Sequence, residues 1–157
     1  MNCFGPIVSS DANTLILGSF PSIVSLEKTE YYGHKYNAFW PIMSSLFNHS
    51  IENYEEKTAL ILQNRLALWD VCYTCKRDGS MDSTIKETVP NEIPKLLDDG
   101  NITKVIFNGQ TAARLYKKTV AYYPDNITFL TVISTSPAAT KPFEEKLKIW
   151  KEALAQS

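Results

Sequence analysis

The sequence lacks the features of membrane-spanning and exported proteins. None of its apolar runs reaches the roughly 18 residues that a membrane-spanning helix needs. The amino-terminal stretch MNCFGPIVSSDANT has no basic region followed by an apolar block, so it does not resemble a signal peptide. Three cysteines are an odd number and do not suggest a disulfide scaffold. These absences predict a cytoplasmic protein with no membrane partner.

The sequence also lacks the common cofactor and metal motifs. It contains no GxGxxG turn, no phosphate loop ending in GKS or GKT, no HExxH and no GxSxG. Cys72 and Cys75 form one CxxC without a second pair, which cannot complete a four-ligand zinc site. We therefore expect no cofactor and no metal. The formal net charge is -1, so binding to nucleic acid would require Lys and Arg to gather on one face.

Four short apolar runs alternate with segments of helical spacing. The runs are TLILGSF, LALWDV, KVIFNG and FLTVIS, and each is continuous, as in strands covered on both faces. Helical spacing is found in NAFWPIMSSLFNH, after Asn53, in NEIPKLLDDG, in GQTAARLYKK and near the carboxyl end. This alternation predicts an α/β fold, with a parallel sheet between helices, in a single domain over residues 1–157. The longest stretch without periodicity, CYTCKRDGSMDSTIKETVPNE, is interpreted as a functional loop or a lid.

The polar ends of the four runs predict a ligand site, because ligands of open parallel sheets bind beyond the carboxyl ends of the strands. The turn GSFPS offers backbone N–H groups to an anion or a carbonyl oxygen, but an ordinary strand-to-loop turn explains it equally well. The loop ISTSPAAT suits contact with a phosphate backbone, or a cap of the next helix. Taken together, the four loops indicate a site better than any one of them.

An aromatic stretch, YYGHKYNAFW, precedes one of the helical segments. Aromatic rings stack on flat bases, and Asn and His supply hydrogen-bond donors and acceptors. Spacing alone favours Asn37 as the N-cap of the following helix. His34, taken alone, fits a packed or surface position better than a catalytic one.

Five segments together resemble the uracil-DNA glycosylase superfamily, and most closely its hypoxanthine (deoxyinosine) DNA glycosylase branch. They are LILGSFPS, YYGHKYNAFWPI, LWDVCYTCKRDGSMDS, VIFNGQTAARL and VISTSPA. The resemblance implies a three-layer α/β/α sandwich around a four-stranded parallel sheet. It also implies a monomeric, monofunctional glycosylase without a cofactor, whose partner is DNA containing a deaminated base.

The resemblance implies roles for individual residues. Most of the superfamily has an Asp or Asn that orients the attacking water where this chain has Phe20, and in the hypoxanthine branch Asn37 takes over as the catalytic residue. The loop from Ser134 to Thr140 is expected to pinch the DNA backbone and fill the gap that the extruded base leaves. The expected base-binding residues are Gly18, Ser19, Phe20, Tyr32, His34, Phe39 and Asn108. The expected DNA-binding residues are Pro21, Ser22, Ser134, Thr135, Ser136 and Pro137.

Three other functions stay open on the sequence. The first is a uracil or mismatched-thymine DNA glycosylase, against which Phe20 argues because a phenyl ring cannot position water. The second is a catalytically weak nucleic-acid binding module of the same fold, which would show salt-sensitive binding without base release. The third is an enzyme that acts on free nucleosides.

Overall fold

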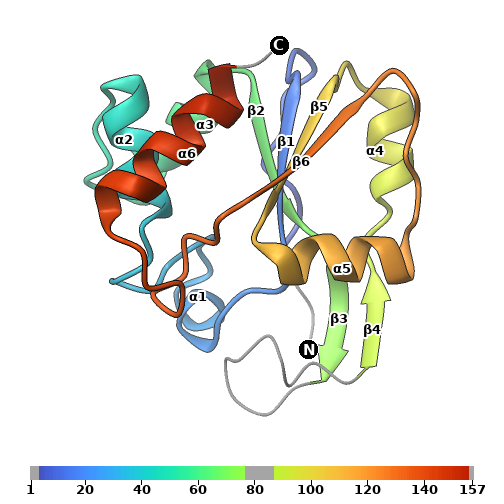
Figure 1. Cartoon of the computed structure of the whole chain (residues 1–157), viewed down its shortest axis with the longest axis horizontal. Helices are drawn as coiled ribbons and strands as arrows, with labels where there is room; N and C mark the ends of the chain where they lie inside the picture. Colours follow the sequence, from blue (N-terminus) through green and yellow to red (C-terminus); the bar gives the residue numbers. More distant parts are fainter. Residues whose placement is uncertain (1–3, 77–86, 156–157) are drawn as a thin grey trace.

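A four-stranded parallel sheet forms the centre of the molecule (Figure 1). The computed structural model describes residues 4–76 and 87–155. The sheet strands are β1 (Thr14–Gly18), β2 (Leu66–Asp70), β5 (Lys104–Asn108) and β6 (Thr128–Val132), in the order β2-β1-β5-β6. All three neighbouring pairs are parallel. These are the four predicted runs, so the predicted parallel sheet is confirmed.

Both faces of the sheet are buried, which explains why its strands are continuous apolar runs. Successive side chains of a strand point to opposite faces. Ile16 therefore packs into the core on one face, and Leu15 and Leu17 pack into the core on the other. The edge strand β2 is also covered, because Ile7 and Leu68 exchange two backbone hydrogen bonds of 2.9 Å.

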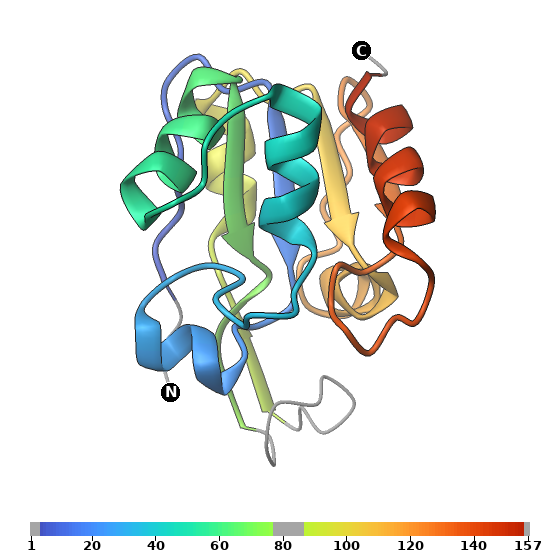
Figure 2. The same cartoon turned by 90° about the vertical axis from the view of Figure 1, so that its left-hand side faces the viewer.

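Helices cover the two faces and complete the expected three-layer α/β/α sandwich (Figures 1 and 2). One face carries α2 (Phe39–Phe47), α3 (Tyr54–Gln63) and α6 (Phe143–Ala155), whose buried side chains join the core around Ile16. The other face carries α4 (Ile93–Asp99) and α5 (Gln110–Thr119), which pack on Leu15 and Leu17. All five helices lie in segments predicted to be helical.

Two elements were not predicted from the sequence. The first is the short helix α1 (Ile23–Lys28), which Ser22 caps by accepting a hydrogen bond from the backbone N–H of Ser25. The second is an antiparallel hairpin of β3 (Cys72–Lys76) and β4 (Glu87–Pro90). These two strands lie within the stretch interpreted as a functional loop or lid, and residues 77–86 between them lie outside the described residues.

The longest helix in the described part of the chain is α6, with 13 residues. A bilayer-spanning helix needs about 20 predominantly apolar residues. None of the helices formed by residues 4–76 and 87–155 is long and apolar enough to cross a membrane.

Candidate active site

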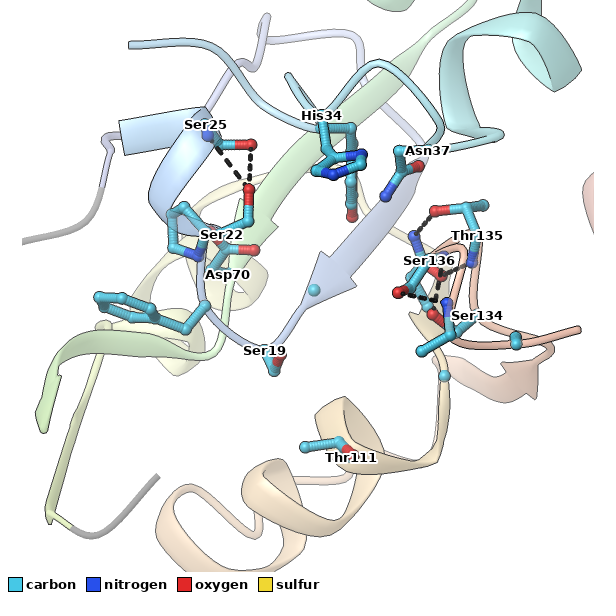
Figure 3. Close-up of a pocket in the computed structure, with 18 of the residues that line it drawn as sticks. Ser19, Ser22, Ser25, His34, Asn37, Asp70, Thr111, Ser134, Thr135 and Ser136 are labelled. Carbon is cyan, nitrogen blue, oxygen red and sulfur yellow. Dashed lines mark hydrogen bonds between the residues drawn. The ribbon is translucent and has the colours of Figure 1, made fainter. Parts of the chain in front are cut away.

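The carboxyl ends of the four sheet strands surround one cavity of about 550 Å³ (Figure 3). The cavity lies at the lower edge of the sheet in Figure 1, where α5 begins. The segment between α1 and α2 contributes a further wall. This volume is typical of small-molecule sites, which occupy roughly 300–1,000 Å³. It is large enough for a nucleobase with part of its sugar.

The cavity brings together every predicted site residue except Phe39. Those that line it are Gly18, Ser19, Phe20, Pro21, Ser22, Tyr32, His34, Asn37, Asn108, Ser134, Thr135, Ser136 and Pro137. Further lining residues, to which no individual role was assigned, are Ser25, Tyr31, Asp70, Gly109, Gln110, Thr111, Ala138 and Ala139. The sequence therefore indicated the loops correctly, while the identity of several lining side chains depends on the fold.

Phe39 is the one predicted base-binding residue that does not line the cavity. Its side chain is fully buried, and its ring stacks on that of Tyr32 with centroids 4.2 Å apart and planes inclined by 28°. Trp40 and Trp150 meet the Phe39 ring edge to face. Phe39 thus supports Tyr32 from behind, and Tyr32 is the ring that lines the cavity.

Asp70 is a functional candidate that the sequence prediction left out. It ends β2 directly opposite Gly18 in the register with β1, and its side chain is buried against the cavity. A Cβ atom on Gly18 would stand 2.5 Å from Asp70 Oδ1 and 3.1 Å from the Tyr32 hydroxyl. Both oxygens therefore approach Gly18 in a way that only glycine permits. A charged residue at the carboxyl end of an apolar strand was the signal that could have identified Asp70.

The backbone of Tyr32 is strained beside the cavity. Its φ is 53°, in the left-handed region that bulky side chains rarely adopt. Such strain persists where the surrounding structure over-determines it, and it is concentrated at functional sites. Here the stacking on Phe39 holds the Tyr32 ring in place, so that its hydroxyl lies near Asp70 and Gly18.

Phe20 is buried in a small apolar cluster with Cys72, which Leu26 and Leu115 cover. The backbone of the same turn is held by hydrogen bonds from Val71 N–H to the Gly18 carbonyl (2.8 Å) and from Cys72 N–H to the Ser19 carbonyl (3.1 Å). The phenyl ring thus anchors the glycine turn to the protein core.

Asn37 lies one residue before the N-cap of α2, which is Ala38, so the predicted N-cap position of Asn37 is wrong. Its Oδ1 accepts a hydrogen bond of 2.9 Å from the backbone N–H of Phe39, in the first turn of α2. A backbone N–H can only donate, so the atom it meets must be the amide oxygen. The amide nitrogen is consequently the group that Asn37 turns toward the cavity (Figure 3). Asn37 thus closes a turn at the start of α2 with its amide oxygen while its side chain lines the cavity.

His34 lies at the same edge of the cavity and presents a hydrogen-bond donor. Its Nδ1 accepts a hydrogen bond of 3.2 Å from the backbone N–H of Tyr36. In the neutral imidazole the proton must then be on Nε2. His34 therefore offers an N–H group to any acceptor in the cavity.

Asn108 lines the cavity and fixes the loop that follows β6. Its Oδ1 accepts from the backbone N–H of Thr135 and its Nδ2 donates to Thr135 Oγ1, both at 2.9 Å. Thr135 is completely buried, and its carbonyl accepts a hydrogen bond of 2.9 Å from Ala38 N–H. Thr135 thereby joins the end of β5, the serine-proline loop and the segment that carries Asn37.

The serine-proline loop, residues 134–139, is folded by its own hydroxyl groups. Ser134 Oγ accepts from the N–H of Ser136, and Ser136 Oγ accepts from the N–H of Ala138. The ammonium of Lys146, which belongs to α6, donates a hydrogen bond of 3.2 Å to the Ser136 carbonyl. Burial lowers the pKa of Lys146 below its ordinary value. The loop is therefore a preformed part of the cavity wall.

Few of the side chains that line this cavity could act as an acid, a base or a metal ligand. Asp70 is the only carboxylate among the lining residues that the structure describes. Across residues 4–76 and 87–155, no group of three or more His, Cys, Asp and Glu side chains is arranged to hold a metal ion. The arrangement suits binding of a flat polar ring, with donors from His34 and Asn37 and an acceptor from Asp70.

The chain is similar to proteins named as DNA glycosylases. A family model described as the Uracil DNA glycosylase superfamily matches residues 6–156. A protein of Methanosarcina barkeri named hypoxanthine DNA glycosylase is 32% identical over 154 residues, covering 96% of this chain and 95% of that protein. A protein of the same name from Methanosarcina acetivorans is 33% identical over 112 residues, covering 69% of this chain and 71% of that protein.

The fold is also similar to a solved structure. It is the solution NMR structure of a Methanosarcina acetivorans protein that carries the provisional name uracil DNA glycosylase. The TM-score is 0.80 at 27% sequence identity, and the match covers 99% of this chain and 98% of that chain. The similarity extends over the whole three-layer architecture described above.

Proposed function

Because the chain belongs to the uracil DNA glycosylase superfamily, we propose that it is a monofunctional DNA glycosylase that removes a deaminated base, with hypoxanthine preferred. The observation that carries this proposal is the Asn37 amide, held at a cavity bounded by the glycine turn and the serine-proline loop. The names of the two similar Methanosarcina proteins support hypoxanthine as the base.

Asp70 is suited to recognise the change that deamination makes. Hypoxanthine carries a hydrogen on N1, whereas its parent adenine carries a lone pair there. A carboxylate only accepts hydrogen bonds, so it attracts the N1–H of hypoxanthine and repels the N1 of adenine. Because Asp70 is buried, a base without a donor there would exclude water from the carboxylate and give no hydrogen bond in return, which is costly. The Tyr32 ring, supported by Phe39, would stack on the same base.

Hydrolysis breaks the bond between the sugar C1′ and the base nitrogen, and water adds to C1′. The transition state resembles an oxocarbenium ion, with positive charge on the sugar and negative charge on the leaving base. We assign to the Asn37 amide nitrogen the task of holding the water oxygen against C1′, a positioning contribution. Backbone N–H groups of Ser19 and Phe20 would stabilise the oxygen of the leaving base. Simple hydrolysis of this kind leaves the DNA strand intact.

Three exposed cations belong to segments that form or border the cavity, and they suit contacts with DNA phosphates. Lys35 lies between His34 and Asn37 in the aromatic stretch. Lys28 donates to the Gly33 carbonyl at 3.0 Å, and Arg114 donates to the hydroxyl of Thr111, which lines the cavity, at 3.1 Å. These groups supply local positive charge in a chain whose net charge is -1.

The test is a panel of duplexes that each contain one hypoxanthine, uracil or mismatched thymine, scored for abasic sites under single-turnover conditions. The proposal expects the fastest release from the hypoxanthine duplex and much slower cleavage of free deoxyinosine. Faster release of uracil or thymine would identify the enzyme as a uracil or mismatch glycosylase. Salt-sensitive binding without any base release would identify a binding module.

A further inference from the structure

Tyr36 is an exposed aromatic side chain that the proposed catalytic roles do not use. Its side chain is 67% exposed, the highest value among the exposed large hydrophobic residues of the described chain. It stands at the tip of a turn in which the Asn37 N–H donates to the His34 carbonyl at 2.9 Å. Lys35 and Tyr36 are the two central residues of this turn, so both project outward.

The turn is held firmly at the mouth of the cavity. The Tyr36 N–H donates to His34 Nδ1 at 3.2 Å, and the rings of His34 and Tyr36 have centroids 5.8 Å apart. On either side of Tyr36, His34 and Asn37 line the cavity. The next residue, Ala38, is hydrogen-bonded to Thr135 of the serine-proline loop. Figure 1 shows these two segments running beside each other at the same end of the molecule.

An extruded base leaves a gap in the DNA stack, and in the serine-proline loop Pro137 is the only side chain of a kind that proteins insert there. That loop was expected to fill the gap, but beyond its serines and threonine it offers only Pro137, Ala138 and Ala139. Proteins that open a base step commonly insert a larger side chain between the bases. Tyr36 carries an exposed ring two residues before Ala38, whose N–H is hydrogen-bonded to Thr135 of this loop.

We propose that Tyr36 enters the DNA stack and occupies the place of the extruded base, while Lys35 contacts the neighbouring phosphate. In the structure the Lys35 ammonium lies 4.9 Å from the centre of the Tyr36 ring, so the cation and the ring are presented together. An aromatic ring stacks on any base, which suits a contact with the undamaged neighbours of the lesion. This inference rests on the proposed function and adds the group that stabilises the opened duplex.

The test compares single-turnover base release by Tyr36→Ala from three targets that differ in pairing. In a paired duplex the gap must be filled, so we expect the rate to fall about 10- to 100-fold, in keeping with the strength of base–aromatic stacking. In a mismatched duplex the loss should be smaller, because extrusion is easier there. In a single strand it should be less than threefold. Tyr36→Phe keeps the ring and should restore the paired rate.

Tyr123→Ala is the matched control, because Tyr123 is also exposed (46%) but lies between α5 and β6, in a segment that contributes no residue to the cavity. It should leave the ratio of duplex to single-strand rates as in the unmodified protein. An equal loss on all three targets in Tyr36→Ala would overturn the inference, and so would a change of this ratio in Tyr123→Ala.

A second measurement does not require catalysis. Binding to a duplex that already contains an abasic site should weaken about tenfold in Tyr36→Ala and recover in Tyr36→Phe. If the unmodified protein releases no base from any duplex, the proposed function fails, and abasic-site binding still decides the role of Tyr36. Unchanged binding in Tyr36→Ala would refute that role even in an active enzyme.

Discussion

Replacing Asn37 separates its local structural role from its proposed catalytic role, because the two tasks use different atoms of one amide. Asn37→Ala removes the Oδ1 that accepts from Phe39 N–H at 2.9 Å, and also the Nδ2 that faces the cavity. Loss of this side-chain hydrogen bond costs about 1 kcal/mol. In a chain of 157 residues this lowers Tm by about 2–4 °C. Loss of one positioned donor slows chemistry by about 100- to 1,000-fold.

Asn37→Ser is the matched variant for this prediction. A serine hydroxyl also accepts from a backbone N–H two residues on, so Ser restores most of the lost Tm. Its side chain is too short to hold water against the sugar, so the rate should stay about 100-fold low. The pair of variants thus predicts a recovery of stability without a recovery of activity.

The assay is single-turnover release of hypoxanthine from a duplex, run beside thermal unfolding of each variant. A near-normal rate in folded Asn37→Ala would refute the catalytic role. If Asn37→Ser restored rate and Tm together, the amide would act only through its hydrogen bond to Phe39 N–H, and the water-positioning argument would fail.

Three further predictions concern the cavity and the core. Gly18→Ala places a Cβ 2.5 Å from Asp70 Oδ1. We expect the free energy of unfolding in urea to fall by about 1–3 kcal/mol and base release to slow more than tenfold. An unchanged rate would mean that the position of Asp70 is unimportant. Asn108→Ala leaves the buried N–H of Thr135 without its acceptor. This loss should lower the free energy of unfolding by about 1–3 kcal/mol and weaken DNA binding. Full stability in this variant would contradict the role of Asn108 in fixing the loop. Burial, together with the neighbouring tyrosines, raises the pKa of the Tyr116 hydroxyl above its ordinary 10.0. As pH rises, the unfolded chain therefore loses the Tyr116 proton before the folded chain does. The free energy of unfolding should consequently fall as pH rises past about 10. Urea unfolding across that pH range should show a shallower fall in Tyr116→Phe, and identical slopes would exclude Tyr116 as the cause.

The sheet and its flanking helices were predictable because buried strands and helices produce characteristic patterns of apolar residues in the sequence. Continuous apolar runs mark β1, β2, β5 and β6, and apolar spacing of three and four marks the longer helices. The helix α1 was missed because its six residues form fewer than two turns, too few to show a period. The hairpin of β3 and β4 was missed because its strands are short and interrupted by a long polar stretch.

The sequence by itself determined where a site would lie, since the carboxyl ends of parallel strands meet at one edge of the sheet and all four ends are polar. Only the tertiary structure decided which atoms face the cavity. The register sets Gly18 opposite Asp70, 52 positions apart in the printed sequence, and packing turns Tyr32 inward while Phe39 is buried behind it. The hydrogen bond to Phe39 N–H likewise decides that Asn37 offers nitrogen and not oxygen. Such choices depend on contacts between distant segments, which local patterns of burial and spacing do not encode.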